Sequence, residues 1–275
     1  MAPDDVIGKW SEEKLQLLGK YLNAFVTVLK KQPWCQGYEY IDGFAGTGRP
    51  RTRDEMRYVD GSPRVALDIA NPFTAYHFIE RTDWRVQRLE QLREEFPERT
   101  ISVYQGDCNK ILGEKILPGL TETSYKRAIA FLDPFGMQLN WPTLEAVAQT
   151  NTVEIILNFP VMAINRNVRR RDQDTVSPAV QKRMNDFWGD NWQADIYQEE
   201  ETLFGRETRL ISQSAKELGQ RYRARLLEIF RFCAVPVLMT NSKNAPLYCL
   251  IFAGQNEVGA KIANDIFMRY LTRMG

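Results

Sequence analysis

The sequence predicts an α/β protein: a Rossmann-like, mostly parallel sheet flanked by helices, with an antiparallel C-terminal hairpin strand. Two observations support this prediction. Between residues 38 and 159, short apolar segments alternate with amphipathic or polar ones, as in βα units whose strands are buried on both faces. Further along, two apolar segments flank a turn-rich stretch at 241–246, as in a β-hairpin.

The first elements follow from helical spacing and turn residues. A helix is expected over 11–31, where apolar residues recur at the spacing of one helix face. A β-rich segment, 38–44, leads into a Gly-rich turn, and the polar stretch 49–59 is expected to be a loop insertion. Ser62 is placed as the N-cap of a helix running to about residue 70, with a proline at its first position.

The alternation of strands and helices then continues. Each expected strand is a short apolar segment, and each expected helix has apolar residues on one face. The strands are expected at 73–80, 101–105, 127–132 and 154–159, and the helices at 84–95, 109–116 and 143–149.

After residue 160 the alternation stops, which indicates a helical and basic insertion at about 161–207 with a helix over 178–188. The part from 208 to 275 is expected to contain a long helix, a hairpin and a closing helix. Their expected ranges are 208–232, 235–240, 247–253 and 257–271. We expect residues 1–275 to form a single domain.

The composition is that of an ordinary globular protein. The 275 residues are 44% hydrophobic and 26% charged, which excludes wholesale disorder and collagen-like repetition. Lys and Arg number 36 against 35 Asp and Glu, a net charge of +1, so the chain is not basic overall, although a local basic patch is compatible with this balance. The single histidine excludes metal sites that need two.

The cysteines and the apolar stretches restrict the cellular setting. Cys35, Cys108, Cys233 and Cys249 form no CxxC pair, so no metal site is expected. Residues 1–10 lack the apolar core of a signal peptide, and the apolar stretches are shorter than the ~18–20 residues of a membrane span. We therefore expect a reduced, cytoplasmic protein without membrane contact.

The segment Asp42–Gly48 (DGFAGTG) directly follows the first expected strand. Glycine tolerates positive φ and lets the backbone approach a ligand closely, and nucleotide-like cofactors bind at such a turn in doubly wound sheets. The segment is not a P-loop, because no Gly-Lys-[Ser/Thr] follows it. A tight structural turn is the alternative explanation of the glycines.

Three later strands each end in an acid: Glu80, Asp107 and Asp133. The carboxyl ends of parallel strands share the edge at which open α/β sheets bind ligands. A carboxylate in the position of Glu80 can accept hydrogen bonds from ribose hydroxyls, and one in the position of Asp107 can accept from an adenine amino group. Four such segments in this order predict a nucleoside-binding edge.

These segments resemble the motifs of class I S-adenosylmethionine-dependent methyltransferases. Asp42–Gly48 resembles their first motif, Glu80 their ribose-binding acid and Asp107 their adenine-binding acid. The resemblance implies S-adenosylmethionine as cofactor. The cofactor-binding residues that it implies are Asp42, Gly43, Phe44, Ala45, Gly46, Gly48, Glu80, Arg81, Asp107 and Cys108.

Asp133-Pro134-Phe135-Gly136 resembles the [Asp/Asn/Ser]-Pro-Pro-[Tyr/Phe] motif of enzymes that methylate exocyclic nitrogens of nucleobases. The Phe-Gly form is similar to that of tRNA guanine-N2 dimethyltransferases, whereas the N-terminal helix and the insertion after the glycines resemble ribosomal adenine-N6 methyltransferases. The resemblance implies catalytic roles for Asp133, Pro134 and Phe135. Gly136 stands where many such enzymes carry an aromatic residue, which leaves the base identity open, and a strand-terminating turn is the alternative explanation.

The implied chemistry is orientation of a weak nucleophile. The lone pair of an exocyclic amino group is delocalised into the ring, and an Asp133 carboxylate or Pro134 carbonyl that accepts its N–H would direct the pair toward the methyl donor. Phe135 would stack on the base.

The candidate substrate-binding residues include Gly136, Trp141, Arg166, Arg169 and Arg170. The arginines follow the strand expected at 154–159, so a basic loop there could hold phosphates; a solvated charged loop is the alternative. Trp141 either walls the acceptor pocket or caps the next helix.

The whole chain resembles the three-Cys-motif partner protein (TcmP) family. The segments that carry this resemblance are Tyr40–Gly46, Gly61–Pro63, Phe78–Glu80, Gly106-Asp107 and Phe131–Gly136. Members are named for a partner with a three-cysteine motif, similar to a radical-S-adenosylmethionine protein, which the resemblance implies as the partner of this chain.

Taken together, the sequence predicts an S-adenosylmethionine-dependent methyltransferase that modifies a nucleobase nitrogen in DNA or RNA and works with a three-cysteine partner. The alternative is a weakly active or inactive partner subunit of the same fold that binds cofactor or nucleic acid. A small-molecule methyltransferase is a third interpretation, which the segment Asp133–Gly136 disfavours.

Overall fold

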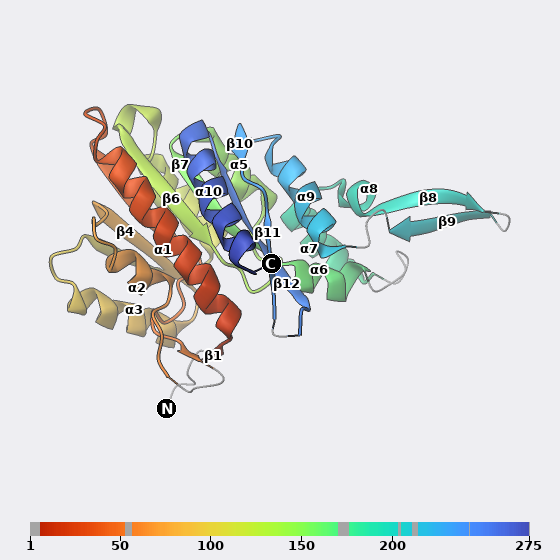
Figure 1. Ribbon diagram of the computed structural model, residues 1–275, viewed down its shortest axis with the longest axis horizontal. Coiled ribbons are helices and arrows are strands. Elements are labelled where there is room, and N and C mark those ends of the chain that lie inside the picture. Colours follow the sequence, from red (N-terminus) through yellow and green to blue (C-terminus); the bar gives the residue numbers. More distant parts are fainter. Residues whose placement is uncertain are drawn as a thin grey trace.

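The computed structural model describes residues 6–52, 57–169, 176–202, 205–210, 214–241 and 243–274. Within these ranges, an eight-stranded sheet has the order β10-β12-β7-β6-β2-β4-β5, with β11 also pairing with β12 (Figure 1). Its strands are β2 (Gly37–Asp42), β4 (Ala75–Glu80), β5 (Ile101–Gln105), β6 (Lys126–Leu132), β7 (Val153–Phe159), β10 (Phe232–Cys233), β11 (Val237–Thr240) and β12 (Pro246–Gly254).

Five neighbouring strands of this sheet, β5, β4, β2, β6 and β7, are parallel, whereas β12 is antiparallel to β7 and to β11. The carboxyl ends of the five parallel strands therefore lie at one edge, as the sequence predicts. The mostly parallel Rossmann-like sheet with an antiparallel C-terminal hairpin is confirmed.

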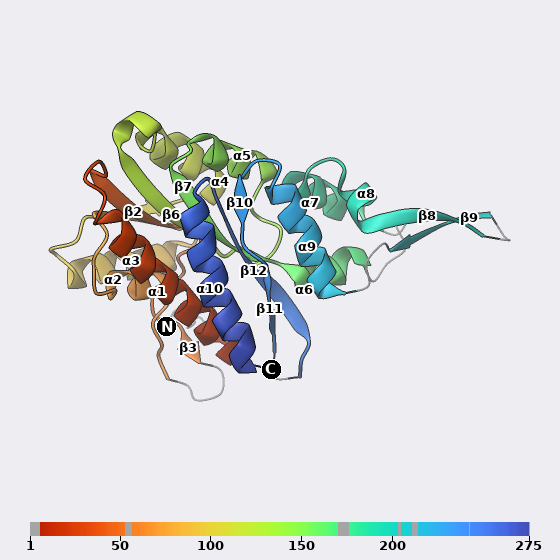
Figure 2. The same cartoon turned by 45° about the horizontal axis from the view of Figure 1, so that its top comes forward.

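Helices cover both faces of the sheet, because successive strand residues point to opposite faces and both faces are apolar. Tyr40 of β2 packs with α1 (Lys9–Leu29), α2 (Ser62–Leu67), α3 (Asp83–Glu95) and α10 (Glu257–Met274). Ile41, the next residue, packs with the helices of the other face. Those are α4 (Cys108–Ile111), α5 (Trp141–Gln149), α7 (Pro178–Trp188) and α9 (Ala215–Leu226), and α4 continues into the π-helical turn η1 (Leu112–Ile116). Figure 2 shows α1 and α10 side by side on their face.

The stretch expected as a loop at 49–59 contains a strand. β3 (Arg51–Thr52) pairs in parallel with β1 (Val6–Ile7), which precedes α1. The start of the chain is thus joined to the segment that follows the glycines.

The N-cap of α2 is Gly61, one residue before the expected Ser62. Gly61 has the extended backbone of the cap, with φ −76° and ψ 174°, and Ser62 is the first helical residue. The side chain of Ser62 hydrogen-bonds to Asp42 instead, so its hydroxyl serves the site and not the helix terminus.

The long helix expected at 208–232 is correct over α9 (Ala215–Leu226) and wrong at its start and its end. Gly205–Leu210 is strand β9, which pairs with β8 (Tyr197–Thr202) in a two-stranded ribbon that projects away from the main sheet (Figure 1). The helix α9 begins at Ala215 because Ser214 and Glu217 form a capping box, in which both side chains satisfy backbone N–H groups of the first turn.

The segment expected to be an insertion is largely helical where it is described. α6 (Val161–Ile164) continues into a π-helical turn, η4 (Asn165–Arg169), and α8 (Trp192–Ile196) follows α7. The rings of Phe159, Phe187 and Tyr222 stack with centroids 4.5 to 5.9 Å apart. This cluster fixes α7 and α9 to the end of β7.

In the ranges that the structure describes, no helix combines the length and the apolar character needed to cross a membrane.

Glu154 of β7 generates a prediction about stability. Its carboxyl accepts the hydroxyl of Tyr21 at 2.6 Å, and a Cβ built on Gly259 would lie 2.5 Å from Glu154 Oε1. Burial raises the pKa of Glu154 to about 7. The folded state therefore binds a proton that the unfolded state has released, and this contribution to stability is lost as the pH rises from about 4.5 to about 7.

We expect Glu154→Gln to flatten the decline in stability over this pH range, since glutamine keeps the shape and carries no charge. The free energy of unfolding at pH 8 should rise by about 3 kcal/mol relative to wild type, a rough upper value from the size of the pKa change. Urea unfolding at several pH values measures it. Part of the slope should remain, because burial also raises the pKa of Asp42 to about 7. An unchanged slope would contradict the prediction.

Candidate active site

The Gly-rich loop crosses the edge where the parallel strands end, and backbone hydrogen bonds hold it there. The N–H of Gly43 donates to the carbonyl of Phe131 on β6 at 2.9 Å, and the N–H of Gly46 donates to Glu80 Oε2 on β4 at 3.1 Å. Gly46 and Gly48 have φ values of 63° and 74°, in the left-handed region that favours glycine. The loop and Glu80 are therefore brought together.

Close packing restricts two further positions. A Cβ at Gly43 would lie 2.8 Å from the Sγ of Cys108, and one at Gly61 would lie 3.0 Å from the backbone of Gly48. The N–H of Gly61 also donates to the Gly48 carbonyl at 2.8 Å. The start of α2 is thus part of the loop's support.

Asp42 lies fully buried beneath the loop. Its carboxyl accepts the hydroxyl of Tyr40 at 2.9 Å and the N–H of Phe44 at 3.3 Å, and it also pairs with the hydroxyl of Ser62. Burial raises its pKa to about 7, against the lowering effect of these donors. In this structure Asp42 organises the loop from below.

Glu80 is also an organiser of the edge. Its Oε1 accepts the N–H groups of Arg81 and Thr82, both at 2.8 Å. Its Oε2 accepts Gly46 and lies 3.7 Å from the guanidinium of Arg85. Each carboxylate oxygen has two lone pairs, so Oε2 keeps capacity for a hydroxyl donor.

Asp107 and Cys108 lie at the start of α4. Asp107 accepts the N–H of Asn109 at 3.0 Å and caps the helix, and its exposed position leaves it open to solvent. Cys108 is buried, and burial raises the pKa of its thiol. Because the thiolate is the reactive form, Cys108 is suited to packing under the loop and not to nucleophilic chemistry.

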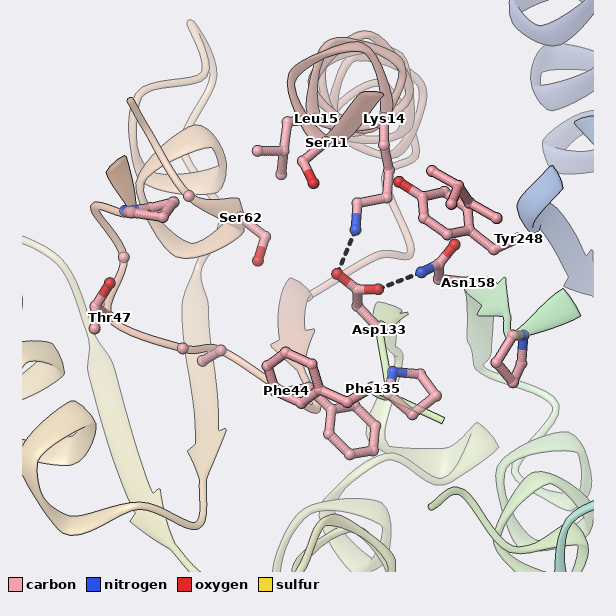
Figure 3. A pocket seen from close by; sticks show the side chains of 18 of the residues that line it. Ser11, Lys14, Leu15, Phe44, Thr47, Ser62, Asp133, Phe135, Asn158 and Tyr248 are labelled. Atoms are coloured by element: carbon pink, nitrogen blue, oxygen red, sulfur yellow. Dashed lines mark hydrogen bonds and ion pairs between the residues drawn. The ribbon is translucent and has the colours of Figure 1, made fainter. Parts of the chain in front are cut away.

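Asp133, at the end of β6, is held by two side chains from distant parts of the sequence (Figure 3). Lys14 of α1 forms an ion pair with Asp133 Oδ2, and the amide of Asn158 on β7 donates to Oδ1. The side chain of Asp133 remains 27% exposed, compared with 5% for Lys14. The carboxylate is thus fixed in orientation while still open to a molecule in the cleft.

Sequence reasoning missed Lys14. Its ammonium lies 5.2 Å from the ring of Tyr248 and 5.7 Å from that of Phe131, so it is surrounded by aromatic rings as well as paired. A signal was present, because Lys14 stands four residues before Leu18 and so lies on the apolar stripe of its helix. A lysine on a buried stripe needs a partner, although the sequence does not say which acid.

The loop after Asp133 is anchored on one side and open on the other. The N–H of Phe135 donates to Gln138 Oε1 at 3.1 Å, and Asn109 donates to the Gln138 carbonyl at 2.9 Å. Phe135 is 79% exposed, and its ring lies 5.4 Å from the guanidinium of Arg85. An exposed, anchored ring beside the cleft is available for stacking.

The Gly-rich loop, the start of α1, the segment 133–135 and the end of β7 line a pocket of about 310 Å³, a size typical of small-molecule sites. Glu80, Asp107 and Cys108 are not part of its lining. Its lining includes Ser11 and Lys14 of α1, Thr47 and Gly48 of the loop, Asp133, Phe135 and Asn158. Among the described residues, Thr47 Oγ1 and Asn158 Oδ1 are buried and have no hydrogen-bond partner in the protein. Buried polar atoms are usually satisfied, so both are suited to bind a polar ligand.

The expected substrate-binding residues are only partly placed here. Trp141 does not line the pocket: it is 5% exposed and packs against Tyr222 and the guanidinium of Arg225, because the first turn of α5 faces the core. Gly136 also lies outside the lining, near Ala163.

The basic loop is described only in part. Arg166 is exposed on η4. Arg169 is the last residue of η4, and its side chain is not among those described; Arg170 lies outside the described residues. A role in phosphate binding stays a prediction for these three arginines.

Comparisons with known proteins show the fold. No protein-family model matches the chain, and a sequence comparison with curated proteins finds no match. Among solved structures, protein LPL1258 from Legionella pneumophila, assigned to the family model DUF519, aligns over 93% of this chain and 90% of its own with a TM-score of 0.53 and 11% identity.

Two further solved structures are less similar. The N-terminal domain of EvdMO1, solved in the presence of SAH and D-fucose, aligns over 86% of this chain and 81% of its own, with a TM-score of 0.44 and 10% identity. Protein yhhF from Escherichia coli, named as a candidate methyltransferase, aligns over 58% of this chain and 75% of its own, with a TM-score of 0.39 and 14% identity. The strand order and the similarity to LPL1258 establish the Rossmann-like architecture.

The loop generates a prediction with a matched control. In Gly48→Ala, the alanine would have to adopt a φ of 74°, and its Cβ would lie 2.9 Å from Leu92 Cδ2. We therefore expect the free energy of unfolding to fall by about 1–2 kcal/mol. In Gly113→Ala, a Cβ meets nothing within 4 Å, and we expect no loss. Thermal unfolding compares the two variants; equal losses would show that Gly48 is not conformationally required.

Proposed function

We propose that this protein is an S-adenosylmethionine-dependent methyltransferase that acts on an exocyclic nitrogen of a nucleobase in DNA or RNA. The observation that carries the proposal is the Asp133 carboxylate, fixed by Lys14 and Asn158 at the end of β6. It faces the same pocket that the Gly-rich loop lines. A hydrogen-bond acceptor for an amino group thus stands beside a loop suited to a nucleoside cofactor.

The residues present fit this cofactor. Glu80 Oε2 can accept a ribose hydroxyl, and the exposed carboxyl of Asp107 can accept an adenine amino group. The backbone of Gly46–Gly48 and the unpartnered Thr47 Oγ1 border the pocket that would hold the methionine part. When bound, the cofactor supplies an electrophilic methyl group on a sulfonium, so a metal or a covalent nucleophile is not required.

The residues around the acceptor would orient it. Asp133 and the Pro134 carbonyl accept the two N–H bonds of the amino group, which localises its lone pair toward the methyl donor. Lys14 and Asn158 keep the carboxylate in one orientation, and this preorganisation is the expected source of rate acceleration. Once methylated, the nitrogen carries an extra proton, which Asp133 is placed to accept.

Phe135 would provide the stacking surface. Its ring is exposed beside the pocket, and stacking on a base is worth about 1–3 kcal/mol. Only one aromatic face is available from this segment, because Gly136 follows. A target base in a duplex would have to be flipped out before it could reach Asp133.

The sequence resemblance to the TcmP family supports a partner with a three-cysteine motif, and we propose that this partner acts together with the chain. The alternative is a scaffold subunit that binds cofactor or nucleic acid with little activity. One observation is compatible with it: both oxygens of Asp133 already accept hydrogen bonds from the protein. Each oxygen nevertheless keeps a second lone pair for a substrate.

Cofactor binding tests the first half of the proposal. We expect S-adenosylmethionine to raise the melting temperature, because a ligand that binds only the folded state stabilises it by about 2.7 kcal/mol at 100 times its Kd. Glu80→Gln should raise the apparent Kd for the cofactor at least tenfold and so reduce this shift, since one ribose acceptor is lost. Each variant is compared with its own unliganded melting temperature, so altered stability does not mimic altered binding. No shift at millimolar cofactor would favour the scaffold alternative.

Transfer of a labelled methyl group to total RNA, genomic DNA and small-molecule extracts tests the second half. We expect Asp133→Ala to lower transfer by more than a hundredfold, about 2.7 kcal/mol or more of transition-state stabilisation, while cofactor binding is retained. Asp133→Asn is the matched variant: it keeps an acceptor oxygen and does not leave the ammonium of Lys14 beside an apolar side chain. Transfer should therefore fall less in Asp133→Asn. Equal loss of transfer and of cofactor binding in both variants would contradict the assigned role.

A further inference from the structure

We propose that the groove on the outer side of α1 binds the sugar-phosphate backbone of the polynucleotide that carries the target base. This inference rests on the proposed function. The groove has a volume of about 690 Å³ and is bordered by α1, the segment 57–60 and the start of α2. Its cations are Lys20, Arg49 and Arg57, and its exposed aromatic residue is Tyr58.

The groove adjoins the candidate acceptor pocket. Leu15 of α1 lines both. Along the loop, Gly48 and Pro50 line the pocket while Arg49 between them lines the groove. A strand whose target base entered the pocket would therefore place its neighbouring nucleotides in the groove.

The charges of the groove favour a polyanion. Of its two acids, Glu12 is paired with Arg57 at 2.7 Å, and Asp60 lies 3.6 Å from Arg64 of α2. Lys20 and Arg49 are exposed and lie outside these two ion pairs. The charge of Arg49 also acts on the nearby carboxyl of Asp68, so Lys20 is the cation of the groove that is least offset by acids. Phosphate contacts by lysine and arginine supply most sequence-independent affinity for nucleic acids.

An aromatic and cationic surface accompanies this charge. Tyr58 is 54% exposed, and the guanidinium of Arg51 lies 4.9 Å from its ring. Surfaces that bind single strands combine a positively charged groove with exposed aromatic rings on which bases stack, and arginine adds cation–π contacts. A free nucleoside would fill the pocket and leave this groove without a role, so the arrangement favours a polynucleotide as substrate.

The test is binding of fluorescent single-stranded RNA and DNA 20-mers, measured by polarisation between 50 and 200 mM salt. In Lys20→Glu/Arg49→Glu we expect at least tenfold weaker binding at 50 mM salt. The slope of log K against log salt should become shallower by about 1.4, because two phosphate contacts are lost at about 0.7 each. Tyr58→Ala should weaken binding about fivefold with an unchanged slope, since stacking releases no counterions.

The matched control is Lys31→Glu/Arg231→Glu. Both residues are exposed and lie at the opposite edge of the sheet, near the amino ends of the parallel strands. The control makes the same change in net charge, so we expect it to bind both probes within twofold of wild type. Whichever 20-mer binds more tightly at 150 mM salt identifies the polynucleotide as RNA or DNA.

Three outcomes would overturn the inference. The first is that both double variants bind the 20-mers equally more weakly than wild type, and the second is that wild type binds poly-glutamate as tightly as the 20-mers. The third is methyl transfer to a nucleoside with no binding of either 20-mer. The last outcome leaves methyl transfer to a nucleobase nitrogen standing but contradicts a DNA or RNA substrate. The cofactor-induced thermal shift of each variant shows whether the cofactor site is intact. If Lys20→Glu/Arg49→Glu unfolds, Lys20→Gln/Arg49→Gln provides the same comparison, with an expected change in slope of the same sign.

Discussion

The ion pair between Lys14 and Asp133 is the contact on which the candidate site depends. It joins the first long helix to the end of β6, across more than a hundred residues of chain. A lysine whose side chain is 5% exposed requires a compensating charge, so the position of α1 over the sheet edge and the orientation of the carboxylate are set together. The wall of the pocket and its acidic group are therefore parts of one structural unit.

The other acids of the edge form hydrogen bonds that stabilise the fold itself. Asp42 holds the loop from below, Glu80 binds the N–H groups of Gly46 and two residues of its own turn, and Asp107 caps α4. Carboxylates that collect several backbone donors stay fixed, and a fixed group loses little entropy when a ligand binds. The site is thus preorganised by the same hydrogen bonds that stabilise the strand ends.

The surface around this edge is asymmetric. On one side, the aromatic cluster of Phe159, Phe187 and Tyr222 fixes the helical segment after β7 as a rigid wall. On the other side, short strands β1 and β3 and the groove beside α1 present exposed arginines, a lysine and Tyr58. A short two-stranded pair is weakly stable by itself, so the side proposed to contact the polynucleotide is also the more adaptable one.

The sequence by itself determined the parallel sheet, the strands that end in Asp42, Glu80, Asp107 and Asp133, and the edge on which these acids meet, because apolar periodicity and glycine-rich turns are local properties of the chain. Strand β9 was mistaken for helix, since the sequence Gly205–Leu210 is mostly polar and shows no alternation of apolar residues that would indicate a strand. Only the tertiary structure decided that Lys14 and Asn158 hold Asp133, that Trp141 turns into the core, and that a basic groove adjoins the pocket. Ion pairs and pockets form between segments far apart in sequence, and their partners are chosen by packing, which no local pattern records.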